Sequence, residues 1–318
     1  MEGLTAKHLT VQLGRPPQTL AEACDSFMAD CIARNLSKQT LALNRIILRD
    51  LMVFLGDIPL ATVKTADLRR FFIEKATATS ASTAARYYNC IKKFFSFLAE
   101  EGVTADNLMS GVRKPKAPTP IIKPLSTEQI EALIATCDTR SFIGLRDKLI
   151  LLILIDCGLR ASELAALTLD DVDLEGQMFL IRHGKGDKSR RVPFGQAVLA
   201  MLKSYLAKRA DVTTPNLIVN AYGEKVDRHR LRKIVVARGE MAGIKCTTHL
   251  LRHTCAVAYL RAGGDAFTLQ KLLGHSTLVM TKRYCELADN DISDKHKLYS
   301  PADRLKNAGD NGKRRRLR

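Results

Sequence analysis

Histidine, arginine and tyrosine are gathered in one segment near the carboxyl end of the chain, residues 248–284. His249, Arg252, His275 and Tyr284 lie there without an acidic pair, a cysteine pair or a nucleotide-binding glycine loop. His249 and Arg252 are three positions apart on a predicted helix, so they share one face near its start. Backbone N–H groups and the helix dipole at such an end favour an anion.

Arg160 is predicted to lie at another helix start, because it follows the helix-stopping Gly158 and precedes the segment ASELAAL. Two arginines placed in this way can hold one phosphate through paired hydrogen bonds. A phosphodiester can be broken without a metal when fixed cations neutralise the phosphorane and a side chain attacks it. Tyr284 is the candidate nucleophile, and Lys185, at the tip of a predicted hairpin, suits a general acid.

Helices must position most of these side chains, and the first third of the chain is predicted to contain only helices. Their starts are marked by the capping box Thr19-x-x-Glu22, by Ser37, by Thr65 and by Ser82. The last of them ends at Gly102. The proline-rich, basic segment 112–124 then resists both helix and sheet, which predicts an extended linker.

The second part of the chain opens at the capping box Ser126-x-x-Gln129, followed by a helix to Ala135. Alternating polarity and two glycines predict a β-hairpin over residues 176–194. Helical periodicity predicts the remaining elements over 145–157, 195–209, 227–242, 249–263, 266–273 and 277–287. The fold class is therefore mainly α with a small β-sheet (α+β).

Composition narrows the class of partner. The 318 residues contain 50 Lys+Arg against 33 Asp+Glu, a net charge of +17. This excess favours a polyanionic partner, either nucleic acid or an anionic membrane surface, and its spread over both halves favours nucleic acid. The longest apolar run, residues 149–157, is too short to span a bilayer, and no secretory signal is visible. The eight cysteines form no CxxC pair, so we expect core residues in a reducing compartment and no zinc site.

Two glycine-containing segments have alternative interpretations. DVDLEG (171–176) has the start of a calcium loop, but the twelfth position is Arg182 where a glutamate is required, which argues against calcium. GKGDKS (184–189) lacks the order of a phosphate-binding P-loop and is better explained by a hairpin turn.

Five motifs match a known family in order and in spacing: GLRASEL (158–164), GKGDKSRRVP (184–193), HLLRHT (249–254), LLGHS (272–276) and TKRY (281–284). The set resembles the tyrosine recombinases, also called phage integrases. The resemblance covers nearly the whole chain. It implies a clamp around DNA, with these parts: a helical core-binding (SAM-like) domain over 1–110, a linker over 111–123, a catalytic domain over 124–300 and a basic tail over 301–318.

The resemblance also implies a role for six residues. Arg160 and Arg252 would clamp the phosphate, and Lys185 would protonate the 5′-oxygen that leaves. The remaining three act on or beside the nucleophile: His249 as the acid/base that assists it, His275 as a hydrogen-bond donor to the scissile phosphate, and Tyr284 as the nucleophile itself. A 3′-phosphotyrosyl link would store the bond energy, so neither a metal nor another cofactor is implied.

The resemblance further implies partners. These are double-stranded DNA with inverted-repeat half-sites and a homo-tetramer, or a hetero-tetramer with a paralogue, that passes through a Holliday junction. Residues 286–300 are expected to dock on a neighbouring subunit. We expect a cytoplasmic, nucleoid-associated protein without a membrane partner. Only about 16 residues precede the first predicted helix, which favours a simple recombinase without an arm-site domain.

Two alternatives to an active recombinase stay open: a topoisomerase and a DNA-binding protein without catalysis. A type IB topoisomerase uses similar side chains, although LLGHS and the helical amino-terminal region argue against it. A DNA-binding protein that has lost catalysis is disfavoured by the intact Tyr284 and Lys185. Cys285 stands where another small or polar residue is expected, which puts no catalytic residue in doubt. Whether the reaction integrates, excises, inverts or resolves is not encoded in these motifs.

Overall fold

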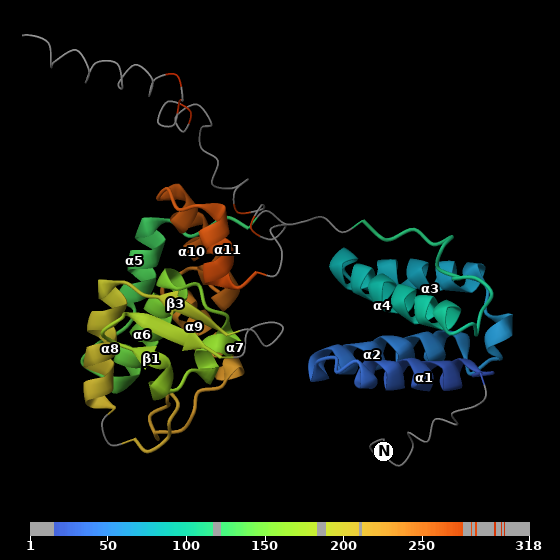
Figure 1. The fold of residues 1–318 in the computed structure, drawn as a ribbon, viewed down its shortest axis with the longest axis horizontal. Helices are drawn as coiled ribbons and strands as arrows, with labels where there is room; N and C mark the ends of the chain where they lie inside the picture. The colour runs from blue at the N-terminus through green and yellow to red at the C-terminus, as the bar shows by residue number, and fades with distance from the viewer. Residues whose placement is uncertain are drawn as a thin grey trace, which may run out of the picture. The chain divides into compact units, whose positions relative to one another are not determined.

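The computed structural model divides the chain into two compact units, Met1–Pro120 and Ile121–Arg318 (Figure 1). The residues that it describes are 16–116, 122–182, 189–209 and 212–275, together with Thr281, Tyr284, His296, Ser300 and Ala302. All of the expected basic tail except Ala302, and most of the expected docking segment 286–300, lie outside the described residues. No helix among the described residues is both long and apolar enough to cross a membrane.

The described residues of the first unit form four α-helices, in which α1 packs on α2 and α3 on α4. Their bounds are Leu20–Ala33 (α1), Lys38–Leu55 (α2), Thr65–Ala78 (α3) and Ala81–Glu100 (α4), with a short 3-10 turn, η2, over Leu60–Thr62. The predicted capping box at Thr19 is confirmed. The hydroxyls of Ser37 and Ser80 cap α2 and α4 by accepting one backbone N–H each, so α4 begins at Ala81, one residue before the predicted Ser82. Apolar faces meet in one aromatic core, in which the rings of Phe27 and Phe94 pack edge to face.

The second unit is mostly helical with a three-stranded antiparallel sheet of order β1-β2-β3. Its helices are α5 (Thr127–Ala135), α6 (Phe142–Asp156), α7 (Ala161–Ala166), α8 (Gln196–Lys208), α9 (Arg228–Met241), α10 (Thr248–Arg261) and α11 (Ala266–Leu273). Its strands are β1 (Val172–Asp173), β2 (Met178–Ile181) and β3 (Arg190–Pro193), preceded by the 3-10 turn η3 (Leu169–Asp171). The predicted mainly helical fold with a small sheet is confirmed.

Two predictions need correction. The buried helix α6 begins at Phe142 instead of Leu145, because the Ser141 hydroxyl accepts the backbone N–H of Gly144 and caps it. The sheet has a third strand, β1, in the segment with the calcium-like pattern. Its acidic residues are used internally there: Asp173 accepts the N–H of Gly176 in the turn to β2. The predicted helix 277–287 lies mostly outside the described residues, although Thr281 and Tyr284 are helical.

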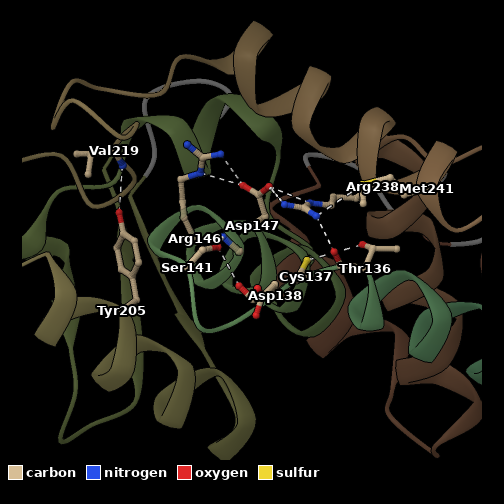
Figure 2. Close-up of polar contacts among 11 residues, drawn as sticks. Thr136, Cys137, Asp138, Ser141, Arg146, Asp147, Tyr205, Val219, Arg238 and Met241 are labelled. Atoms are coloured by element: carbon tan, nitrogen blue, oxygen red, sulfur yellow. Dashed lines mark hydrogen bonds and ion pairs between the residues drawn. The ribbon is translucent and has the colours of Figure 1, made fainter.

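Helix α6 forms the centre of the second core and packs against α8, α9 and α10. A buried carboxylate fixes it to α9 (Figure 2). Asp147, 4% exposed, accepts two hydrogen bonds from Arg146 and two from Arg238, at 2.6–2.9 Å. Arg238 also donates to the carbonyl of Thr136 at the end of α5. Breaking such a buried pair costs about 3–5 kcal/mol, so this cluster holds three helices in register.

The cysteines support the interpretation as core residues. All seven described ones, Cys24, Cys31, Cys90, Cys137, Cys157, Cys246 and Cys255, are buried free thiols. Burial raises the pKa of Cys24 and Cys255 to about 12, which keeps them protonated and unreactive.

Candidate active site

Arg160 lies where α6 gives way to α7. Gly158 follows the end of α6 with φ of 59°, a left-handed conformation that reverses the chain, and Arg160 is the N-cap residue of α7 as predicted. Its guanidinium donates to the Glu163 carboxylate at 2.7 Å and to the carbonyl of Gly274 at 3.1 Å. The side chain remains 29% exposed, so it is fixed in place but still accessible to a ligand.

Arg252 reaches the same place from α10. It is 3% exposed and donates to the carbonyls of Gly158 (2.5 Å) and Leu273 (2.7 Å). Burial and the positive charge of Arg160 lower the pKa of Arg252 to about 10, which still leaves it cationic at neutral pH. These two bonds use two of the five N–H groups of a guanidinium.

The carboxyl end of α11 is where the two arginines converge. The Leu273 carbonyl accepts from Arg252 at 2.7 Å and from Arg160 at 3.4 Å. A helix end carries carbonyls without intrahelical partners and a partial negative charge, so it is a suitable support for cations. The αL conformation of Gly274, the C-cap, turns the chain directly from this support into His275.

His249 is the second residue of α10, near the helix start as predicted. It lines a cavity of about 520 Å³ whose other lining residues are Arg160, Ala161, Ser162, Arg232, Val236, Thr247, Thr248 and Arg252. Partial desolvation of the ring, with the positive charges of Arg252 and Arg160, lowers the pKa of His249. The cavity therefore has at least three arginines and one histidine in its wall, the composition expected of an anion site.

His275 and Tyr284 lie together beyond the arginines. The two rings stack at 6.0 Å with an angle of 20°, and Tyr284 also contacts the ring of His253 at 5.2 Å. His275 Nδ1 is 3.1 Å from the Thr281 hydroxyl. Its Nε2 is buried and has no hydrogen-bond partner within the described part of the chain. Burial and the charges of Arg252 and Arg160 lower the pKa of His275 to about 4, so the ring is neutral at pH 7.

Tyr284 is 8% exposed and packs in a small apolar cluster with α10 and α11 residues: Ala256, Val257, Leu260, Leu269 and Leu273. Leu273 thus belongs to the same apolar cluster as the tyrosine and binds both arginines through its carbonyl. This one residue links the candidate nucleophile to the candidate phosphate clamp.

Of the six predicted site residues, the structure brings five into one region: Arg160, His249, Arg252, His275 and Tyr284. The sixth, Lys185, lies outside the described residues, as do both glycines of its predicted turn. Strands β2 and β3, which flank that segment, form the predicted hairpin in the register Ile181↔Arg190.

Two site residues were missed in the sequence, Glu163 and Arg190. Glu163 was detectable, because it lies three positions after Arg160, where a glutamate bonds back to the N-cap N–H. Arg190 was harder to find, since only its alternation with buried Val192 places it on the inner face of β3. No group of three His, Cys, Asp or Glu side chains suited to a metal occurs in the described ranges.

Comparison with known proteins extends these observations to a family. Residues 123–291 match the model of the phage integrase family, and residues 25–102 match that of the phage integrase N-terminal SAM-like domain. The tyrosine recombinase XerD of Proteus mirabilis is 33% identical over 287 residues, 85% of this chain and 90% of the relative. The tyrosine recombinase XerC of Pelobacter propionicus is 34% identical over 265 residues, 80% and 87% of the two chains.

A solved structure shares the fold. The lambda integrase in a tetramer bound to a Holliday junction superposes with a TM-score of 0.69 at 17% identity, over 87% of this chain and 83% of that one.

Proposed function

The chain belongs to the phage integrase family and is a tyrosine-type site-specific DNA recombinase, and from that premise we propose how its residues divide the reaction. The observation that carries the proposal is the convergence of Arg160 and Arg252 on one carbonyl, that of Leu273, with His275 and Tyr284 directly behind it. This is a cationic pocket beside a buried tyrosine.

Arg160 and Arg252 bind the two non-bridging oxygens of the scissile phosphate. Both side chains line the cavity, and their charge neutralises the phosphorane that forms when the phosphorus becomes five-coordinate. Because the backbone carbonyls already hold both guanidinium groups, little reorganisation is needed when the phosphate arrives. His275 adds a third donor in the tautomer whose Nδ1 accepts from the Thr281 hydroxyl, because the proton of the neutral ring is then on Nε2.

Tyr284 attacks the phosphorus, so that a bond from its phenolic oxygen forms and the bond to the 5′-oxygen breaks. His249 takes the phenolic proton, and its lowered pKa leaves the ring unprotonated and able to do so. Lys185 gives a proton to the leaving 5′-oxygen. The product is a 3′-phosphotyrosyl link. A 5′-hydroxyl of another strand then attacks its phosphorus, which joins the two strands and releases Tyr284 without ATP.

The substrate is proposed to be double-stranded DNA with inverted half-sites, each bound by one subunit. A related integrase has been solved as a tetramer on a Holliday junction, which supports a tetramer here. Relatives named XerC and XerD are both near 33% identical, so a hetero-tetramer with a paralogue is as compatible as a homo-tetramer. Such an enzyme would act in the cytoplasm, where the chromosome is.

The test is to trap covalent adducts on DNA from the host. The protein is denatured after incubation, and the DNA that stays attached is sequenced. The wild-type chain and Tyr222→Phe, whose ring is 86% exposed, should give adducts on one recurrent sequence with inverted half-sites. Tyr284→Phe should bind that sequence equally well and give none.

Other outcomes would contradict the proposal. Adducts scattered over unrelated sequences, with relaxation of supercoils by a monomer, would indicate a topoisomerase. A Tyr284→Phe chain that still recombines the sites would exclude Tyr284 as the nucleophile.

A further inference from the structure

Arg190 lies at the start of β3, beside the proposed phosphate clamp but outside the set of six residues. Its side chain is 13% exposed and makes three hydrogen bonds to protein groups. Two go to the Glu163 carboxylate, one to each oxygen, at 3.0 and 2.9 Å. The third goes from Nε to the carbonyl of Leu272 at 3.0 Å. Arg190 therefore joins β3, α7 and the end of α11.

Glu163 is shared between Arg190 and Arg160. Its Oε1 accepts from the guanidinium groups of Arg160 (2.7 Å) and Arg190 (3.0 Å), and its Oε2 accepts from the Arg160 backbone N–H and from Arg190, both at 2.9 Å. A carboxylate has about four acceptor sites, so this one is saturated. Burial alone would raise the pKa of Glu163, but the bonds from Arg190 and Arg160 hold it below its ordinary value.

The end of α11 provides the other acceptors for these arginines, which are backbone carbonyls. Three successive carbonyls accept from three arginines: Leu272 from Arg190, Leu273 from Arg252 and Arg160, and Gly274 from Arg160. A Cβ at Gly274 would come within 2.9 Å of the Arg190 guanidinium, which is pinned on Glu163 and cannot easily withdraw. The backbone here is shaped to admit this arginine.

We infer that Arg190 is a positioning residue for strand cleavage: it holds Glu163 and the end of α11 so that Arg160 and Arg252 keep their orientation toward the phosphate. The inference deepens the proposed function and rests on it. Without Arg190, Glu163 loses half of its donors and draws more strongly on Arg160, and the Leu272 carbonyl is released. The planar fork of arginine matters, because the three bonds leave three separate nitrogens, whereas the three donors of a lysine all leave one nitrogen and match this spacing poorly.

The neighbouring residue provides a matched control. Arg191 has the same charge and lies on the same strand, but its side chain faces outward and is exposed. Arg190→Gln and Arg191→Gln therefore remove one positive charge at adjacent positions, and only the first removes the contacts with Glu163 and Leu272.

The experiment measures single-turnover cleavage of a nicked duplex of the sequence recovered as an adduct, at saturating protein, together with the dissociation constant for the same duplex. Arg190→Gln should lower the cleavage rate about 100-fold, the cost of a misplacement of about 1 Å, with the dissociation constant nearly unchanged. Arg190→Lys should recover part of the rate, and Arg191→Gln should cleave like the wild type.

A second substrate separates the arginine clamp from the hairpin that carries Lys185. With sulfur in place of the bridging 5′-oxygen, the leaving group is a thiolate, which needs no proton from a general acid. Lys185→Ala should regain cleavage on this duplex, whereas the defect of Arg190→Gln should persist. If Arg190→Gln regains cleavage to the same extent, Arg190 acts through the hairpin and the inference is wrong.

The pKa of His275 gives a measurement of the site that does not depend on the cleavage rate. Arg190 is one of the charges that lower the pKa of His275, so its loss should raise that pKa from about 4, as followed by NMR in Arg190→Lys and Arg190→Gln. The lysine variant should show little change and the glutamine variant a clear rise. Equal cleavage rates in Arg190→Gln and Arg191→Gln would overturn the inference. A wild-type chain that forms no adduct would refute the proposed function itself.

Discussion

His275 should make the second unit less stable in mild acid. In the folded chain its ring is buried beside Arg252 and Arg160, which lowers its pKa to about 4 from an ordinary value of 6.5. The folded state therefore excludes a proton that the unfolded chain binds readily. As the pH falls below 6.5 the unfolded state is protonated first, and stability is lost until the folded ring also titrates near pH 4.

The size of the effect follows from the two pKa values. A difference of about 2.5 pH units corresponds to about 3 kcal/mol at most, reached near pH 4, at 1.36 kcal/mol per unit. At pH 5 the loss is about 2 kcal/mol relative to pH 7. The pKa of His249 is also lowered, so this residue changes stability in the same direction. It is present in both the wild type and the His275→Gln variant, so its contribution cancels when the two are compared.

Hydrogen exchange measured by mass spectrometry is the suitable assay, because it reports each unit of a two-unit chain separately. The opening free energy of the slowest amides of α10 is compared at pH 7 and pH 5, in the wild type and in His275→Gln. The wild type should lose about 2 kcal/mol more than the variant between the two values. Peptides of α4 in the first unit serve as an internal control. An equal loss in both proteins would refute the assignment of a neutral, buried His275.

Two further substitutions test the framework of the site. Asp147→Ala leaves Arg146 and Arg238 buried without their carboxylate, so it should cost about 3–5 kcal/mol of unfolding free energy, measured by hydrogen exchange in α6. Gly158→Ala places a Cβ 2.7 Å from Leu273 at a left-handed φ. It should cost about 2–5 kcal/mol from the strain and the overpacking together, with a matching fall in melting temperature, and slow cleavage by displacing the carbonyl that holds Arg252.

Local signals explain why much of the fold could be predicted from the sequence. Ser, Thr and Asp side chains before apolar runs predict helix starts because they satisfy N–H groups that a helix leaves open, and the caps at Thr19 and Ser126 do so. Strand β1 was missed because two residues are too few to show alternation, and its pairing with β2 depends on contacts made only in the folded chain.

The candidate catalytic side chains of the site could be predicted from the sequence, but the backbone carbonyls that hold them could not. Arg160, Arg252 and His275 were identified because their residue types carry chemistry, and motif spacing relates them. The carbonyls of Leu272, Leu273 and Gly274 carry no signal in residue type, since every residue has a carbonyl. Their use as acceptors depends on where α11 ends relative to α7 and α10, which is a property of packing alone.

Several arginines that bind one phosphate must be held close together, although their positive charges repel one another. Like charges repel in a buried pocket, whereas one carboxylate for each arginine would neutralise the charge that the phosphate needs. Here the three guanidinium groups of Arg160, Arg190 and Arg252 are accompanied by one carboxylate, that of Glu163, so their formal charges add to 3 − 1 = +2. Glu163 binds Arg160 and Arg190 directly, and Arg252 binds the carbonyls of Gly158 and Leu273. The other contacts go to uncharged carbonyls, four contacts at the end of α11 and one at Gly158, which orient the arginines and leave their charge in place. The site therefore keeps its attraction for a phosphodiester because most of its support comes from the backbone.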